Sequence, residues 1–295
     1  MTSKTDVAAE ITALMIKKIE SGTMPWERPW HSQSLIPLRH NGERYTGINH
    51  LYLSCVTDSH GYTSPYWMTY RQASELGSRV RKGEHGYFSV YFNRATKTDH
   101  NTVTGEDTTR TFGFLKHYFV FNADQIEGLP PHYHPPVPEP RPVGSMRPAA
   151  QAFFDAIPIP VRHRGSEAFY RPLADEITLP DPGLFKTIDH YISTRAHETI
   201  HATGHKSRLD RRFGKRFGSD AYAAEEMVAS IGQSGLCALF DLPPELHDNH
   251  ASYLESWLRV LKGDKTAIIH AAAKAEQAIK WLHDCAAQAE LRDAA

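Results

Sequence analysis

Hydrophobic residues recur near the start of the chain with the spacing of one helix face, and Gly22 ends the pattern. The apolar positions are Val7, Ile11, Leu14, Met15 and Ile19. Dense apolar runs with strand character follow at residues 87–92 and 111–121. The polar segment between them, residues 93–107, is expected to be a mobile loop. These patterns predict a small α+β domain with an antiparallel sheet.

The second half of the chain is dominated by helical patterns. Helices are expected near residues 148–156, 188–203, 222–230, 250–261 and 265–291. Two short strands are expected at 168–171 and 176–179, before the helix at 188–203, which Gly204 ends as a C-cap. The fold class is therefore α+β, with a small α+β head followed by a mainly helical domain.

A proline-rich stretch separates these two patterns. Its prolines are Pro130, Pro131, Pro135, Pro136, Pro138, Pro140, Pro142 and Pro148. Such a sequence favours extended polyproline geometry over packed helix or sheet. We therefore expect a first domain at residues 1–130, a linker at 131–147 and a second domain at 148–295.

Composition sets the class of protein without deciding its partners. A chain of 295 residues can build two separate cores, and its net charge of −1 neither favours nor excludes nucleic acid. Three cysteines lie far apart without a CxxC pair, which fits a reducing compartment. The N-terminus lacks the apolar core of a signal peptide, and no apolar run is long enough to span a membrane. A cytoplasmic protein without membrane partners is expected.

The motif with the clearest chemistry is the HExxH run at residues 197–201, HETIH. It lies within the helix predicted at 188–203, which contains no proline or glycine. Residues four apart in a helix lie above one another, so the imidazoles of His197 and His201 project towards one metal ion. Glu198 stands beside that face and can take a proton from a metal-bound water. The run predicts a metal site with Glu198 as the catalytic base.

A site of this kind needs a third protein ligand, and two patterns compete for it. The metzincin pattern would place a histidine where this chain has Ser207, and His205 comes too early to replace it. The other pattern takes a glutamate from the following helix, residues 222–230. Glu226 is the preferred ligand, because small residues one turn later let this helix approach the first closely. Glu225 and His205 remain alternatives.

Zinc is the metal expected at this site, with another divalent ion such as Mn²⁺ as the alternative. Extended substrates of zinc peptidases pair with an edge strand above the metal helix, and residues 176–179 are the expected edge strand. A metal retained only to brace the fold would use the same ligands, so turnover does not follow from the motif alone.

Aromatic and basic residues alternate in the head in a way that suits a single nucleic-acid strand. Aromatic faces stack on unpaired bases, while Arg and Lys follow the phosphates. The candidate contacts are Trp26, Trp67, Arg71, Arg81 and Lys82. A solvated protein surface can show the same pattern, so composition leaves the partner of the head undecided.

Longer motifs resemble the ArdC-type antirestriction proteins of conjugative plasmids. In the head these are residues 25–30 (PWERPW), 45–49 (YTGIN), 67–77 (WMTYRQASELG), 80–84 (VRKGE) and 120–129 (VFNADQIEGL). In the second domain they are residues 197–205 (HETIHATGH), 208–211 (RLDR), 222–229 (YAAEEMVA) and 250–261 (HASYLESWLRVL). Related heads occur in plasmid primases of the TraC type. The motifs follow the family's order over nearly the whole chain.

The resemblance implies a head that binds single-stranded DNA joined to a zincin-like metallopeptidase domain. It also implies protection of incoming plasmid DNA from host restriction, with a host restriction-related protein as a candidate target. A rival hypothesis is a non-enzymatic DNA-binding or decoy protein with a structural metal. A nuclease is a third, because metal-activated water also attacks phosphodiesters. A single metal on a helical HExxH makes the nuclease the weakest of the three.

Overall fold

The computed structural model describes residues 6–22, 24–26, 36–100, 107–136, 147–211, 219–242 and 250–293. The chain forms two compact units. The sheet unit comprises residues 37–45 and 56–135, and the helical unit comprises residues 1–36, 46–55 and 136–295. The predicted α+β class with two domains is confirmed.

In space, the predicted N-terminal helix belongs to the helical unit. Helix α1 (Val7–Glu20) buries the predicted stripe except for Leu14, which is half-buried, and packs on α7 (His250–Gly263). Thr12 Oγ1 donates to the Lys265 carbonyl at 2.7 Å, and Trp26 meets Trp257 edge-on with ring centroids 5.2 Å apart. Trp26, from the motif at residues 25–30, thus contributes to the core around α7. Helix α2 (Gly47–His60) belongs to the helical unit up to Cys55.

The sheet unit contains a four-stranded sheet in the order β1-β2-β5-β4. The strands are β1 (Leu38–Arg39), β2 (Tyr66–Met68), β4 (Tyr87–His100) and β5 (Asp107–Asn122). Strand β1 runs parallel to β2, whereas the other pairs are antiparallel. A second pair joins β3 (Arg79–Val80) to β6 (Ile126–Glu127), and the short helix α3 (Tyr70–Glu75) precedes β3.

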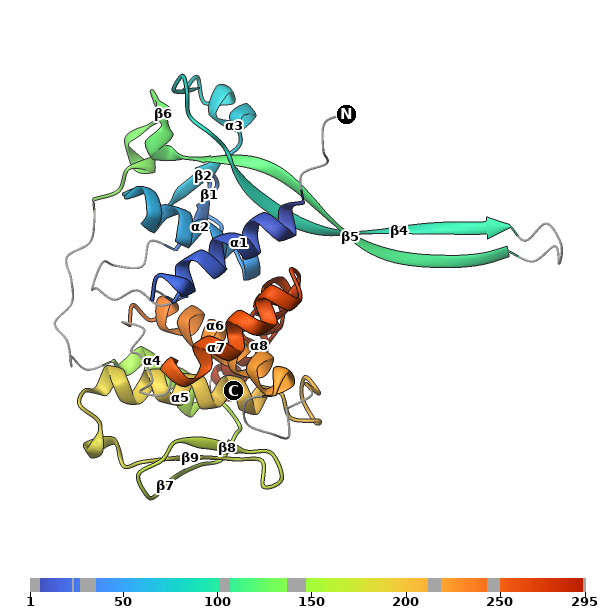
Figure 1. Ribbon diagram of the computed structural model, residues 1–295. Helices are drawn as coiled ribbons and strands as arrows, with labels where there is room; N and C mark the ends of the chain where they lie inside the picture. Colours follow the sequence, from blue (N-terminus) through green and yellow to red (C-terminus); the bar gives the residue numbers. More distant parts are fainter. Residues whose placement is uncertain are drawn as a thin grey trace. The chain divides into compact units, whose positions relative to one another are not determined.

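The loop predicted between the two head strands is wrong over most of its length. Strands β4 and β5 form a long two-stranded ribbon whose register continues from Tyr87↔Val120 to His100↔Asp107 (Figure 1). Residues 101–106 lie outside the described residues. Threonine recurs in this segment, and its β-branched side chain favours strands although it counts as polar in a hydrophobicity pattern. Because these residues are mostly polar, a pattern of apolar runs did not predict the strands that they form.

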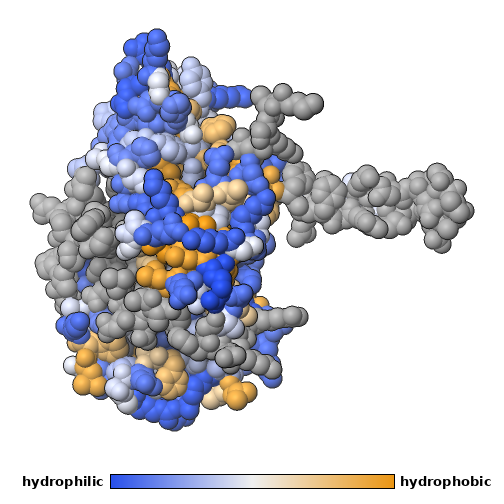
Figure 2. All heavy atoms as spheres, in the orientation of Figure 1, coloured by the Kyte–Doolittle hydropathy of each residue, from blue (hydrophilic) through white to orange (hydrophobic). Residues whose placement is uncertain are grey.

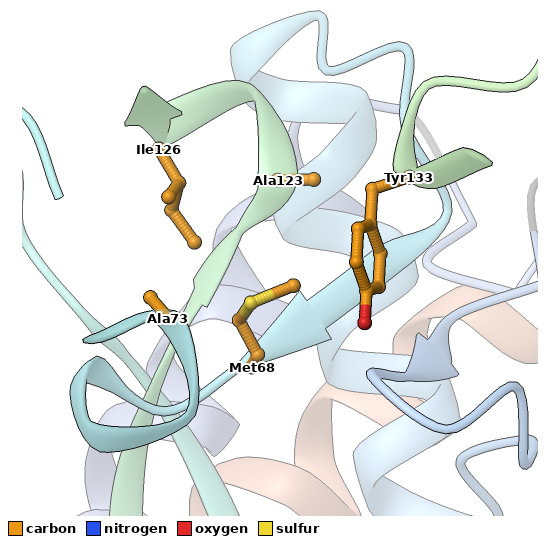
Figure 3. Close-up of a cluster of buried hydrophobic side chains, with 5 residues drawn as sticks. All are labelled: Met68, Ala73, Ala123, Ile126 and Tyr133. Carbon is orange, nitrogen blue, oxygen red and sulfur yellow. The ribbon is translucent and has the colours of Figure 1, made fainter. Parts of the chain in front are cut away.

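The first part of the predicted linker packs in the sheet unit. Pro131–Tyr133 forms the 3₁₀ turn η2, and the ring of Tyr133 joins a buried cluster with Met68 and Ile126 (Figure 3). Ser64 Oγ donates to the Tyr133 carbonyl at 2.6 Å, and the Tyr133 hydroxyl donates to the His40 carbonyl at 3.1 Å. Residues 137–146 of the linker lie outside the described residues.

The helical unit packs α5 (Ile188–Thr203), α7 and α8 (Ala267–Asp293) around α6 (Asp220–Leu239). Helix α4 (Pro148–Asp155) contacts α5. A three-stranded sheet also lies against α5, as Figure 1 shows. Its strands, in the order β7-β9-β8, are β7 (Val161–His163), β9 (Glu176–Leu179) and β8 (Phe169–Arg171). Helices α4, α5, α7 and α8 agree with the sequence prediction within a few residues, whereas α6 continues to Leu239, beyond the predicted segment 222–230.

No helix within the described ranges combines the length and the apolar character that crossing a bilayer requires.

Candidate metal centre and nucleic-acid interface

Helix α5 carries the HExxH run in its last two turns. Thr187 caps its first turn by accepting a hydrogen bond from the His190 amide at 3.0 Å, and Gly204 ends it as predicted. Most of its residues are buried, including Ile192 and Ile200. The helix is therefore a rigid support, and tertiary packing fixes the direction in which its histidines project.

The two histidines of the run and one glutamate converge at a single point. The Nε2 atoms of His197 and His201 lie 3.2 Å apart. Each also lies 3.4 Å from an oxygen of Glu226, which comes from α6. One candidate ligand atom from each residue lies within 4.8 Å of the others. Two nitrogens and one carboxylate are a donor set that suits zinc and other divalent ions.

The outer nitrogens of both histidines are held by acceptors. His197 Nδ1 lies 3.1 Å from Gln233 Oε1, and His201 Nδ1 lies 3.3 Å from Glu225 Oε1. An amide or carboxylate oxygen at Nδ1 holds the proton there and leaves the Nε2 lone pair for a metal. The residues therefore fit a metal ion at the point where the Nε2 atoms meet.

Glu225 is placed beside the ligand set by a buried arginine. Arg211 Nη2 donates to Glu225 Oε1 at 2.8 Å, and the same guanidinium donates to Thr203 Oγ1 at 2.7 Å. It also donates to the Ile200 carbonyl at 2.6 Å. Glu225 thus supports His201, whereas Glu226 faces both Nε2 atoms. Glu226 is therefore the candidate third ligand, and Glu225 is a candidate support of His201.

His205, the other alternative ligand, points elsewhere. Its Nδ1 lies 2.7 Å from Ser207 Oγ and 3.6 Å from Asp175 Oδ2. It is absent from the convergent group of metal-type side chains found among the described residues.

Charge interactions within the site shift the pKa values of His201 and Glu226 in the direction opposite to the effect of burial. Burial lowers the pKa of His201, but the nearby carboxylate of Glu226 and the bond to Glu225 outweigh it and raise that pKa well above its usual value. Burial likewise raises the pKa of Glu226, yet the two imidazoles outweigh it and hold the pKa well below its usual range. The cluster concentrates negative charge where a cation would be bound.

Glu198 lies on the side of α5 that faces the sheet. Its carboxylate accepts a hydrogen bond from the Tyr170 backbone N–H in β8, and burial raises its pKa. Arg208 fixes the neighbouring turn, because its Nη1 donates to Asp175 Oδ2 at 2.9 Å and its Nε donates to the Ala202 carbonyl at 2.8 Å. A raised pKa suits a group that must accept and later release a proton.

The edge strand expected from the sequence is wrong. Residues 176–179 form β9, which is the central strand and pairs with both β7 and β8. All four of its residues are buried. Order along the chain cannot reveal this, because β7 enters the sheet beside β9 from an earlier segment. Strand β8 is the edge strand that reaches Glu198.

A close contact between α5 and α6 holds the ligands from the two helices together. A Cβ built on Gly232 would meet three atoms of Ile200 at 2.8–3.0 Å, and Ile200 is fully buried. We expect Gly232→Ala to destabilise the protein by about 1 kcal/mol, because overpacking costs about 1–3 kcal/mol and the opposing gain in helix propensity is about 1 kcal/mol. Metal affinity should fall as well.

Calorimetric unfolding and metal titration measure both effects of the Gly232 substitution. Gly263→Ala is the matched control, because a Cβ at Gly263 meets no atom within 4 Å. Equal behaviour of the two variants would contradict a tight contact at Gly232.

Known proteins match the chain in two blocks. The N-terminal domain of the anti-restriction factor ArdC matches residues 5–121, and a zincin-like metallopeptidase domain matches residues 148–274. The antirestriction protein ArdC from plasmid R388 is 43% identical in its metal-free crystal structure, with a TM-score of 0.82, covering 96% of this chain and 99% of that one. The chain belongs to the ArdC family of antirestriction proteins.

The chain is also similar to a second crystal structure and to two further proteins. The Mn(II)-bound structure of R388 ArdC is 42% identical, with a TM-score of 0.80 over 96% of this chain and 99% of that one. An uncharacterized protein of Sinorhizobium fredii, y4eC, is 35% identical over 95% of this chain and 92% of its own length. A DNA primase TraC of Escherichia coli is 38% identical over 91% of this chain, which spans only 26% of the primase.

A divalent metal is indicated by two of these findings together with the geometry. The zincin-like domain covers the convergent side chains, and the R388 relative has been crystallised with Mn(II).

The predicted DNA contacts are divided between core and surface. Trp26 and Trp67 are 5% and 0% exposed, so neither ring offers a face to a base. Trp26 lies in the core of the helical unit and Trp67 in that of the sheet unit, and sequence could not tell core aromatics from exposed ones. Arg71 is exposed beside Glu75, Arg81 is partly exposed beside Glu84, and Lys82 is exposed.

The sheet unit also carries exposed aromatic side chains that were not among the predicted DNA contacts. Phe92 is 59% and Phe119 is 49% exposed. The register Phe88↔Phe119 and Phe92↔Leu115 places both on one face of the β4–β5 ribbon. Tyr70, 61% exposed, precedes Arg71 in α3. Figure 2 shows one side of the molecule, on which hydrophobic side chains lie among hydrophilic ones. Phe88 and Phe92, two aromatics of the same parity in the run at residues 87–92, were the sequence signal for this ribbon face.

Proposed function

We propose that this chain is a metal-dependent peptidase of the ArdC antirestriction family whose sheet unit binds single-stranded DNA. It would act in the cytoplasm to protect incoming plasmid DNA from host restriction. The observation that carries the peptidase half is the convergence of His197, His201 and Glu226 beside Glu198. The family match supports the antirestriction half.

Each residue of the site has a distinct role in this proposal. His197, His201 and Glu226 would hold the ion, zinc by preference and Mn²⁺ as the alternative. When bound there, the metal supplies a water of lowered pKa and polarises the scissile carbonyl. Glu198 would take the proton from that water and later return it to the leaving amine. Gln233 and Glu225 keep the two imidazoles oriented.

Strand β8 is the surface that we assign to an extended peptide substrate. It lies at the edge of the three-stranded sheet and its Tyr170 amide touches Glu198. A peptide that pairs with an exposed strand edge gains backbone hydrogen bonds, and its scissile bond would lie near the catalytic base. A host restriction-related protein would be the target.

The DNA half of the proposal rests on exposed cations and aromatics of the sheet unit. We expect the full-length protein to bind an oligonucleotide more tightly as a single strand than as a duplex, and less tightly as salt rises. Phe92→Ala with Phe119→Ala should weaken single-strand binding, because each stacked base contributes about 1–3 kcal/mol. Fluorescence polarisation measures these affinities.

Leu173→Ala is the control for the aromatic substitutions, since it also removes an exposed apolar side chain but lies in the helical unit. Equal affinity for single strand and duplex would count against base stacking. Unchanged affinity in the Phe92 and Phe119 variant would exclude this face of the ribbon.

A DNA-binding protein with a purely structural metal is the second candidate, favoured by the tightly braced ligands. Plasmid transfer into a restricting host separates the two functions. Protection should be lost in Glu198→Gln if the peptidase is required, because this change leaves the metal ligands in place. Full protection by Glu198→Gln would favour the structural alternative.

A further inference from the structure

Three arginines surround one glutamate on the sheet of the helical unit. We call Arg162, Arg164 and Arg171 the arginine face. Arg162 and Arg171 both contact the Glu176 carboxylate, and Arg164 Nη2 lies 3.7 Å from Glu176 Oε1. They come from β7, from the residue after β7, and from β8, with Glu176 in β9 between them.

The strand register places these side chains on the side of the sheet that faces away from α5. Arg171 is opposite Glu176, so the two share a face. The next residue of β9, Ile177, points the other way and is buried. On that opposite side, His163 Nε2 lies 3.0 Å from the Tyr191 hydroxyl of α5.

The arginine face has more positive charge than its single carboxylate can balance. Three guanidinium groups and one carboxylate leave a formal surplus of two positive charges. The arginine side chains are 68%, 50% and 40% exposed, whereas Glu176 is 8% exposed beneath them. Arg171 Nε is buried and lacks a hydrogen-bond partner among the described residues. The exposed parts of the three guanidinium groups are accessible to a further anion.

The position of Arg171 relates this charge to the candidate peptidase site. Arg171 follows Tyr170, whose amide touches Glu198, along the edge strand β8. In a peptide added to that edge, alternate side chains would point to the same side as Arg171. A nucleic-acid strand has no amide and carbonyl ladder to pair with a strand edge, so the location favours a peptide.

We propose that the arginine face selects acidic substrates, by pairing with Asp or Glu side chains of an extended peptide bound along β8. This rests on the proposed peptidase function. The acidic residues would occupy alternate positions of the peptide on the Arg171 side of the sheet. Arg162 and Arg164, which come from the β7 end beyond the central strand β9, would add positive charge on that same side. Hydrogen-bonded carboxylate–guanidinium pairs would add selectivity to the backbone pairing.

The test uses full-length metal-loaded Glu198→Gln protein, which should bind peptides without cleaving them. The probes are a fluorescent peptide with Glu at every second position, its Gln analogue and a single-stranded oligonucleotide. The acidic peptide should bind more tightly. Arg162→Gln with Arg171→Gln should weaken its binding by roughly 2- to 30-fold, the combined effect of two exposed ion pairs. Binding of the Gln analogue should not change.

Two further variants separate recognition from folding. Arg164→Gln leaves both close pairs to Glu176 intact, so the fold should persist while acidic-peptide binding falls roughly 2- to 5-fold. Arg259→Gln removes one exposed arginine of the same unit at a distant position on α7 and should have no effect.

Equal binding of the acidic peptide and its Gln analogue would overturn the proposal. So would arginine variants that weaken oligonucleotide binding and leave peptide binding unchanged, because the face would then serve nucleic acid. Cleavage assays with metal-loaded wild-type protein distinguish failure of the arginine-face proposal from failure of the proposed peptidase function. Arginine-dependent peptide binding without any cleavage would sustain the arginine face and contradict the peptidase. Cleavage of both peptides alike, insensitive to the arginine variants, would contradict the arginine face alone.

Discussion

Glu226→Gln should abolish stable metal binding, while Glu225→Gln should leave a measurable site. Glu226 faces both Nε2 atoms at 3.4 Å, and an amide is a poor replacement for a carboxylate ligand. We expect its loss to weaken metal affinity by more than about 100-fold, beyond the 10- to 100-fold effect of groups that only orient a ligand. Calorimetric titration with Zn²⁺ and Mn²⁺ measures the affinities.

Glu225→Gln is the matched control, because it makes the same chemical change one residue earlier. Its amide oxygen can still accept from His201 Nδ1, but the buried Arg211 loses its charged partner. A moderate loss of metal affinity is expected, together with a lower unfolding temperature. If the two variants exchanged these behaviours, Glu225 would be the ligand and the assignment would be reversed.

Glu198→Gln should keep the metal and lose peptide cleavage. Glutamine has nearly the volume of glutamate and can still accept the Tyr170 amide, but it cannot take a proton from water. Loss of general base catalysis lowers the rate by about 10²–10⁴-fold. Mass spectrometry of peptide products gives the rate, and elemental analysis of the same sample gives the metal content.

Two outcomes of the Glu198 substitution would contradict the proposed role. Undiminished cleavage with bound metal would remove Glu198 from the mechanism. Loss of metal together with activity would make Glu198 a ligand or a structural support. The Tyr170 hydrogen bond makes the second outcome a real test, because it relates Glu198 to the sheet as well as to the site.

The convergence of His197 and His201 could be predicted because their relation is local. Two histidines four residues apart share a helix face in any α-helix, and helix 188–203 was evident from its pattern. Glu226 was harder, since Glu225 lies next to it. The small residues of the second helix supported Glu226, although the closest approach to Ile200 occurs at Gly232.

The supports of the site could not be predicted because they depend on contacts between distant segments. Arg211 comes from the segment after α5, whereas its partner Glu225 is in α6. Gln233, which holds His197, lies about two helical turns after Glu226 in α6. The central place of β9 likewise depends on pairing with β7. Burial of Trp67 was also beyond reach, because aromatic residues suit a core and a stacking surface equally well.

Anomalous diffraction from crystals of the Mn²⁺- or Zn²⁺-loaded protein tests the central claim most directly. A single peak is predicted within bonding distance, about 2.0–2.2 Å for zinc, of His197 Nε2, His201 Nε2 and a Glu226 oxygen. A peak bound without Glu226, or bound away from the two histidines, would contradict the proposed metal centre.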